Sequence, residues 1–238
     1  MAGHSKWANI KHKKAKEDAK RGQSFTKLSK EMTVCARSSG GDPEGNPRLR
    51  QLIEKARGIN MPLDNITRAI KKGTGELPGV QYEAVKFEGS GPGGMAIIVE
   101  VLTDNNNRTV ADMRHLFNKY NGNLGATGSV AWMFDHLGVI RTTAPKFSED
   151  ELLEALIDFE VQDISIEDNM LTITTTIPAL LSVKEALEKL NIIVEHAELE
   201  WVARTSVELP EEKEQQAYTL LERLEEQEDV QNVYSNLN

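Results

Sequence analysis

The sequence predicts an α+β fold: an N-terminal basic three-helix bundle followed by two α/β modules, one of them ferredoxin-like and inserted in the other. Apolar side chains recur only at helical spacing over 22–73, whereas strand patterns mix with helices after residue 79. Over 135–207 the patterns follow the order β-α-β-β-α-β of the ferredoxin-like split unit. A helix and a strand over 210–234 have no local partner, so we expect them to return to the module of residues 80–134.

The charge of the chain divides at the linker GTGELPG, residues 73–79. Residues 1–75 carry 17 Lys and Arg against 7 Asp and Glu, a net charge of +10. The remaining residues carry 11 against 30, a net charge of −19, so the overall −9 is an average of two unlike parts. Opposite charges on two parts of one chain indicate separate modules, with the basic one suited to a polyanion. The expected domains are 1–75, 80–134 with 208–238, and 135–207.

Helix caps and turn residues mark the predicted bundle. Ser24 is the expected N-cap of the first helix, and Asn46 precedes Pro47, which suits the first position of the second. Lys71 and Lys72 fall in the last turn of the third, where the helix dipole favours cations. The three helices are expected from Ser24 to the glycine pair 40–41, from Asn46 along Leu49, Leu52, Ile53 and Ala56, and from Pro62 to Gly73.

The module after the linker is predicted to be β-β-α. Residues 89–94 (GSGPGG) match G-x-G-x-x-G formally, but a strand follows them rather than the helix that a dinucleotide site requires. A tight hairpin with positive φ angles is the better interpretation. Asp104 and the three asparagines after it are interpreted as a helix cap rather than a calcium loop. We expect strands over 80–88, 95–102 and 129–134 and a helix over 107–120.

The inserted unit is expected to contain strands over 138–142, 163–167, 170–176 and 192–203, with helices over 148–159 and 180–190. The chain then continues with a Glu-rich helix over 210–228 and a strand over 230–234. The acidic modules are predicted to be repelled by an anionic polymer and to face away from it. Their sheets and helices are a hypothetical surface for protein partners.

The segment of residues 6–21 is the strongest functional signal. It is predicted to be a mobile arm or a marginal helix, because only Trp7, Ile10 and scattered alanines could pack. Its cations, with interleaved aromatic and amide side chains, suit phosphate neutralisation, stacking and hydrogen bonding. The alternative is a solvated charged helix. The expected nucleic-acid-binding residues are Lys6, Trp7, Asn9, Lys11, His12, Lys13, Lys14, Lys16, Lys20, Arg21, Lys27, Arg37, Arg48, Arg50, Arg57, Arg68, Lys71 and Lys72.

Other functional classes receive little support from the sequence. No set of nucleophile, base and acid assembles, so we expect no enzyme activity, no catalytic residue, no cofactor and no small-molecule substrate. His4 and His12 lack further ligands nearby, so no metal is expected. One cysteine, Cys35, excludes an internal disulfide framework, and the N-terminus lacks the apolar stretch of a secretory signal. We therefore expect a cytoplasmic protein without a membrane partner.

Four segments carry a resemblance to a known family. GHSKWANIKHKKAKEDAKRG, NPRLRQLIEKARGINMPLDNITRAIKKG, and FEGSGPGGMAIIVEVLTDNNNRT followed by NGNLGATGSVAWMF resemble the YebC/PmpR family. The resemblance implies a three-domain cytoplasmic protein that binds promoter DNA as a transcriptional regulator. The family is related to the mitochondrial translational activator of cytochrome c oxidase. The alternative that it implies is a ribosome-associated translation factor that contacts ribosomal RNA and relieves stalling at proline-rich sequences.

Overall fold

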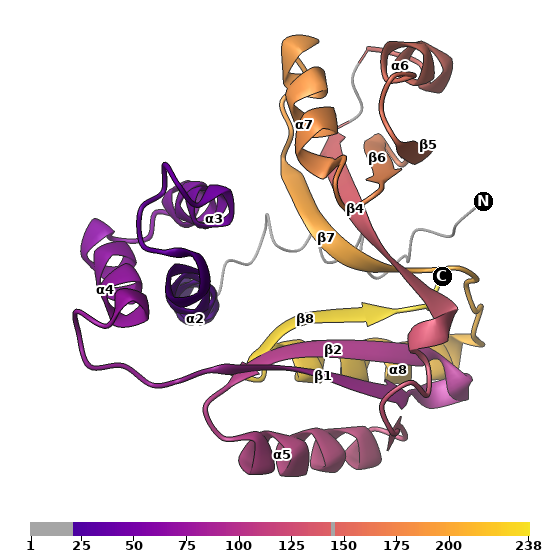
Figure 1. Ribbon diagram of the computed structural model, residues 1–238. Helices are drawn as coiled ribbons and strands as arrows, with labels where there is room; N and C mark the ends of the chain where they lie inside the picture. Colours follow the sequence, from indigo (N-terminus) through magenta and orange to yellow (C-terminus); the bar gives the residue numbers. More distant parts are fainter. Residues whose placement is uncertain (1–20, 144–145) are drawn as a thin grey trace. The chain divides into compact units, whose positions relative to one another are not determined.

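The computed structural model describes residues 21–143 and 146–238 (Figure 1). Its described residues form two compact units. One contains Ala131–Glu208 and Asn236–Asn238, and the other contains 21–130 and Leu209–Ser235. Among the described residues, no helix combines the length and the apolar character that crossing a bilayer would require.

The predicted bundle consists of helices α2 (Arg21–Ser39), α3 (Pro47–Gly58) and α4 (Leu63–Thr74). Its core contains buried side chains from all three, among them Met32, Leu49 and Ile66. Asn46 caps α3 as predicted, with its side chain accepting the N–H of Leu49. The expected cap Ser24 is wrong, because the chain is already helical at Arg21. Gln23 anchors this first turn by donating to the carbonyl of Glu226, 3.2 Å away.

Gly73 does not end the third helix, in contrast to the prediction. The helix continues to Thr74 and ends at Gly75, whose φ of 84° is left-handed. Gly73 lies inside the helix at its crossing with α2. A Cβ atom there would stand 2.5 Å from the carbonyl oxygen of Thr33 and 2.7 Å from Cβ of Ala36. The glycine is therefore required by close helix packing and not by a turn.

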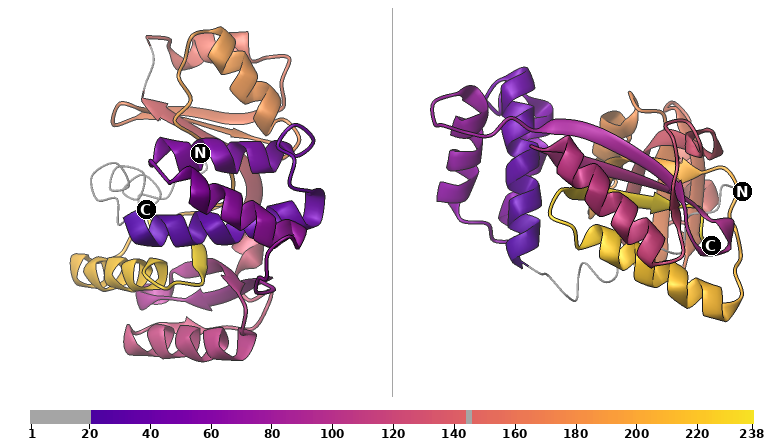
Figure 2. Two further views of the ribbon diagram at one scale, coloured as in Figure 1. Left: turned by 90° about the vertical axis from the view of Figure 1, so that its left-hand side faces the viewer. Right: turned by 90° about the horizontal axis from the view of Figure 1, so that it is seen from below.

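The first sheet has the strand order β3-β1-β2-β8. It is built from β1 (Glu83–Ser90), β2 (Ala96–Thr103), the short β3 (Asn123–Leu124) and β8 (Val230–Ser235). The antiparallel pairing of β8 with β2 confirms that the C-terminal segment returns to this sheet. Helices α5 (Asn106–Lys119) and α8 (Glu211–Glu225) lie side by side on one face of the sheet, as the view from below in Figure 2 shows.

The glycine-rich loop is the predicted hairpin connection. Gly91 donates to the carbonyl of Met95 at 2.8 Å, and a short 3-10 turn, η1 (Pro92–Gly94), fills the loop. Gly93 and Gly94 have φ angles of 73° and 82°, which a side chain would oppose. Within the run of residues 104–107 interpreted as a helix cap, Asn105 caps α5, and its side chain accepts the N–H of Arg108.

The strand expected over 129–134 is wrong. A 3-10 turn, η2 (Ala131–Met133), precedes the strand β4 (Phe134–Thr143) instead. The reason lies in the buried carboxylate of Glu88, which accepts the N–H groups of Gly128 and Val130 at 3.0 Å each. These donors are therefore not available to a strand ladder.

The ferredoxin-like prediction is confirmed by the second sheet, whose order is β5-β6-β4-β7. Its other elements are α6 (Glu149–Ala155), β5 (Val161–Glu167), β6 (Met170–Thr175), α7 (Leu180–Lys189) and β7 (His196–Ala203). Helix α6 is shorter than expected, because the N–H of Phe159 turns back to the carbonyl of Leu156. Strand β7 begins late, because the N–H of Ile192 bonds the carbonyl of Leu187 at the end of α7.

A buried ion cluster joins β4 to β7 in this unit. The Arg141 guanidinium binds both carboxylate oxygens of Glu200, at 2.6 and 2.8 Å, and His196 lies 2.7 Å from the same carboxylate. Burial alone would raise the pKa of Glu200, but Arg141 and His196 outweigh it and lower the pKa. These charges are paired within the unit, so the cluster is a structural feature.

Candidate nucleic-acid interface

The predicted binding residues divide between a part of the chain that the structure describes and a part that it does not. Nine of them lie outside the described residues: Lys6, Trp7, Asn9, Lys11, His12, Lys13, Lys14, Lys16 and Lys20. Arg21 is the first residue of α2. The described bundle, residues 21–75, carries 11 basic and 5 acidic side chains, a net charge of +6. A polyanion therefore still meets an excess of cations on the helices alone.

Exposed cations lie on the outer side of α4. Lys71 and Lys72 follow Arg68 by three and four residues, so all three share one face of the helix. The buried residues Ile66 and Ala69 occupy the opposite face. Within the described chain, no hydrogen bond or ion pair involves these three basic side chains or that of Arg57 on α3. Their charges are therefore available to phosphate groups.

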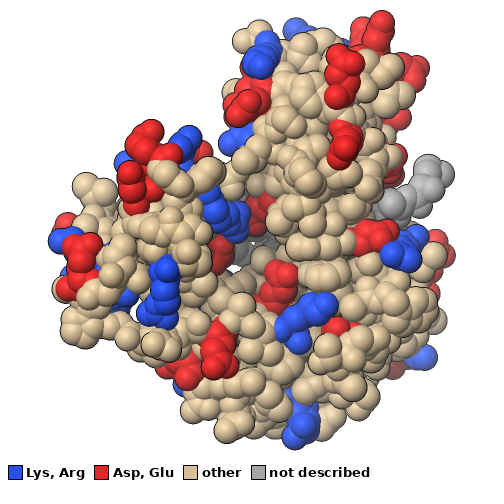
Figure 3. Space-filling model, viewed as in Figure 1, with Lys and Arg blue, Asp and Glu red and all other residues tan. Residues whose placement is uncertain are grey.

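Three further predicted cations are exposed but already have partners. Arg37 donates to the carbonyl of Val80 at 3.2 Å, and Arg48 pairs with Glu31 at 3.2 Å. Arg50 donates to the carbonyls of Pro43 and Glu44 at the entrance to α3. Such exposed contacts are weak, and a phosphate group can compete with them. Figure 3 shows Lys and Arg interspersed with Asp and Glu over the bundle on the face drawn.

Lys27 is not brought together with the other predicted cations. Its ammonium group donates to the carbonyl of Glu225 at 2.9 Å, at the C-terminal end of α8. Gln23 and Lys30, on the same side of α2, donate to the carbonyls of Glu226 and Glu228. A lysine near a helix C-terminus satisfies carbonyls that lack helical partners and compensates the negative end of the dipole. Lys27 therefore has a structural contact that the sequence does not suggest.

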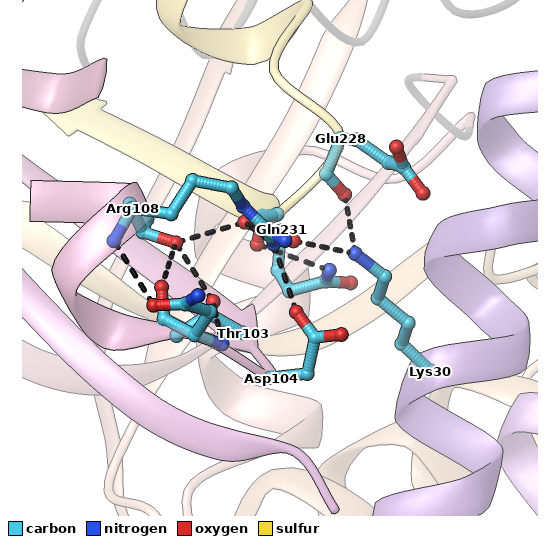
Figure 4. Close-up of polar contacts among 9 residues, drawn as sticks. Lys30, Thr103, Asp104, Arg108, Glu228 and Gln231 are labelled. Atoms are coloured by element: carbon cyan, nitrogen blue, oxygen red, sulfur yellow. Dashed lines mark hydrogen bonds and ion pairs between the residues drawn. The ribbon is translucent and has the colours of Figure 1, made fainter. Parts of the chain in front are cut away.

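Asp229 is the centre of a polar network that sequence reasoning missed, and Figure 4 labels its partners Lys30 and Arg108. Its Oδ1 accepts from Lys30 at 2.8 Å. Its Oδ2 accepts from Arg108 at 2.9 Å and from the Thr109 hydroxyl at 2.8 Å, both in the first turn of α5. Arg108 also pairs with Asp104 at 2.8 Å. One carboxylate thus links α2 to the start of α5. We call this network, with the Lys27 and Gln23 contacts, the α2 junction.

The charge of Asp229 is strongly favoured in the folded protein. Burial alone would raise its pKa, but hydrogen bonds from Lys30, Arg108 and Thr109 outweigh it and lower the pKa from 3.8 to about 2. The Lys30 side chain is only 6% exposed and that of Asp229 11%, so salt screens this pair weakly.

The sequence contains one signal for these contacts, the spacing of Gln23, Lys27 and Lys30, which places the three side chains on one face of α2. This spacing does not identify their hydrogen-bond partners, which lie about 200 residues later in the chain.

The low pKa of Asp229 predicts a loss of stability in acid. The carboxylate stabilises the fold fully above the unfolded pKa near 4, and this contribution disappears as the pH falls through about 2. Relative to Asp229→Asn, the wild type should lose about 2 kcal/mol of unfolding free energy between pH 6 and pH 2. Urea unfolding of both proteins at each pH measures this difference. A difference that stays constant with pH would contradict the assignment.

The comparisons with known proteins cover both parts of the molecule. A model described as the TACO1/YebC protein N-terminal domain matches residues 5–76. A second model, the TACO1/YebC second and third domain, matches residues 82–237. The chain belongs to the TACO1/YebC family. This confirms the resemblance found in the four sequence segments.

Curated members of the TACO1/YebC family resemble the chain over nearly its whole length. A protein of Persephonella marina is 54% identical over 99% of this chain and 95% of its own length. A protein of Geotalea uraniireducens is 51% identical over the same shares. Both are named "probable transcriptional regulatory protein". The crystal structure of a conserved hypothetical protein from Aquifex aeolicus, 46% identical, matches 93% of this chain and 91% of its own with a TM-score of 0.84.

Proposed function

We propose that the chain is a nucleic-acid-binding regulator of gene expression that acts on promoter DNA. The observation that carries this proposal is the division of charge, with +10 over residues 1–75 and −19 over the rest. The exposed cations on α4 and at Arg57 add basic charge on a folded surface. The name of the relatives supports a regulatory role. No residue is assigned to catalysis, and the protein is expected to act in the cytoplasm without a cofactor.

The proposed contacts are made mainly to phosphate groups. Lys and Arg neutralise phosphates and release counterions, which gives affinity and strong salt dependence but no sequence preference. A promoter-specific regulator must additionally prefer its own sites, typically by about 10³-fold or more over bulk DNA. The alternative is a translation factor whose same cations contact ribosomal RNA. Polymer preference therefore separates the two functions.

The test compares both polymers with one purified protein. Genomic fragments bound by the full chain are selected and sequenced, and their affinities are compared with bulk duplex. In parallel, cell extracts are fractionated on gradients to find whether the protein sediments with ribosomes. Enriched promoter fragments support the proposal. Ribosome association without preference among duplexes would replace it with the translation function, and binding to neither polymer would reject both.

A triple variant on α4 tests which surface is used. Replacing Arg68, Lys71 and Lys72 by serine should reduce the slope of log K against log salt by about 3 on duplex, since each phosphate contact contributes about 0.9. Anisotropy titrations at several salt concentrations measure the slope. The matched control replaces Arg114, Lys119 and Lys213 by serine, which removes the same charge from exposed positions outside the bundle. An equal change in the control would show that only net charge matters.

A further inference from the structure

We propose that Asp229 is a positioning residue that fixes the direction of the nucleic-acid-binding helices relative to the first sheet. The inference rests on the proposed function, because it concerns the surface assigned there. Asp229 itself contacts no nucleic acid in this proposal. It acts through Lys30 on α2, and through Arg108 and Thr109 on α5 (Figure 4).

The contacts between α2 and the sheet module are made by long polar side chains. Gln23, Lys27 and Lys30 lie one helical turn apart and donate to oxygens at the end of α8 and the following turn. The hydrophobic core of the bundle, by contrast, contains residues of the bundle alone. Among the described residues, the direction of α2 therefore depends on hydrogen bonds to the sheet module, because the core of the bundle includes no residue of that module.

Among these contacts, the ion pair of Lys30 with Asp229 has the most firmly held acceptor. Gln23 donates to the backbone carbonyl of Glu226 at an exposed site, and Lys27 donates to that of Glu225 at a half-buried site. Asp229 offers a charged and buried acceptor whose second oxygen is already held by two donors from α5. Its backbone carbonyl also accepts the N–H of Leu102, 2.8 Å away, at the end of β2. An acceptor that cannot turn holds the Lys30 ammonium group in one place.

The α2 junction lies where its rigidity can affect nucleic-acid binding. Helix α2 follows directly on the basic segment of residues 6–20 and packs against α4, which carries the exposed cations. A fixed α2 therefore gives the bound polyanion one direction relative to the first sheet. The Glu-rich helix α8, which packs on that sheet, then stays at one position relative to the polyanion. Loss of Asp229 would leave every cation present but remove this constraint.

The first experiment measures the constraint without nucleic acid. Spin labels are attached to Glu54→Cys on α3 and Asn118→Cys on α5, both exposed positions, in a Cys35→Ala background. Electron–electron distance measurements on the full chain should give one narrow distribution. Asp229→Asn and Lys30→Met should each lose this narrow distance, and the double variant should be no broader than either single variant. Circular dichroism before freezing confirms that each variant is folded, so a merely destabilised but ordered protein would keep the narrow distance.

Asp112→Asn is the matched control. Asp112 lies one turn after Arg108 and lines the same surface pocket as Arg108 and Asp229. Among the described residues, no hydrogen bond involves its side chain. The replacement removes the same charge and should leave the distance unchanged. A narrow distribution in Asp229→Asn, or an equally broad one in Asp112→Asn, would overturn the proposal.

The second experiment adds a short duplex labelled at one end and measures energy transfer to a dye at Asn118→Cys. The wild type should give one narrow transfer efficiency. Asp229→Asn should give a broad one, with affinity within about threefold and an unchanged salt slope, because all cations remain. A weaker affinity with an unchanged narrow efficiency would overturn the positioning role. If the wild type binds neither duplex nor a ribosomal RNA fragment, the proposed function fails, while the spin-label distances still decide the role of Asp229 within the fold.

Discussion

Changing Lys11, Lys13 and Lys14 together to glutamate is expected to abolish nucleic-acid binding at physiological salt. The change converts three cations into anions in the most basic part of the chain, where residues 1–30 hold nine basic and two acidic side chains. Losing three phosphate contacts, with repulsion added, should weaken binding by about 100-fold or more. The thermal transition should stay the same, because the segment is predicted to have no core of its own. Anisotropy and melting curves of the variant measure both.

The matched control for this variant reverses three exposed lysines of the acidic modules, Lys146, Lys189 and Lys213. Net charge changes equally in the two variants, so a difference between them reports the location of the charge. Binding should be nearly unchanged in the control. If the Lys11, Lys13 and Lys14 variant still bound nucleic acid at physiological salt, the basic segment would have no part in binding.

Gly73→Ala is expected to destabilise the bundle by about 2 kcal/mol. The added Cβ would meet the Thr33 carbonyl at 2.5 Å, and a backbone oxygen cannot turn aside as a flexible side chain can. Helices α2 and α4 must then separate, and overpacking of this kind costs about 1–3 kcal/mol or more. The better helix propensity of alanine returns only about 1 kcal/mol. Chemical unfolding followed by far-ultraviolet circular dichroism measures the change.

Gly58→Ala is the control for helix propensity. Gly58 is the last residue of α3, and a Cβ atom there would meet nothing within 4 Å. Its replacement should be neutral or should stabilise by up to about 1 kcal/mol. Equal stability of the two variants would show that α2 and α4 can move apart freely.

Local chemistry explains which features were predictable. Asn46 and Asn105 cap helices through a backbone N–H three residues away, and the strand order of the ferredoxin-like unit follows from its sequence pattern. Gly73 and Ser24 were interpreted from local rules alone, and tertiary packing decided otherwise. A glycine serves equally in a helix end and in a close helix crossing, and only the partner helix distinguishes the two.

In the candidate site, too, the sequence predicts local features but not tertiary partners. Arg68, Lys71 and Lys72 were predicted to lie on one helix, and the structure places them on its exposed side. Lys27 was grouped with them because its charge is the same, yet its partner is a carbonyl 198 residues away. Lys30 and Asp229 were not predicted, since no sequence pattern joins residues separated by 199 positions.

The return of β8 to β2 imposes an order on folding during synthesis. All strands of the ferredoxin-like unit lie between residues 134 and 203, so this unit can form while the ribosome still holds the C-terminal segment. Strand β2, whose residues are almost all buried in the finished protein, has an unpaired edge until β8 is synthesised. An apolar edge of this kind promotes aggregation. A nascent chain that stops before residue 230 should therefore depend on chaperones to keep β2 from pairing with other chains.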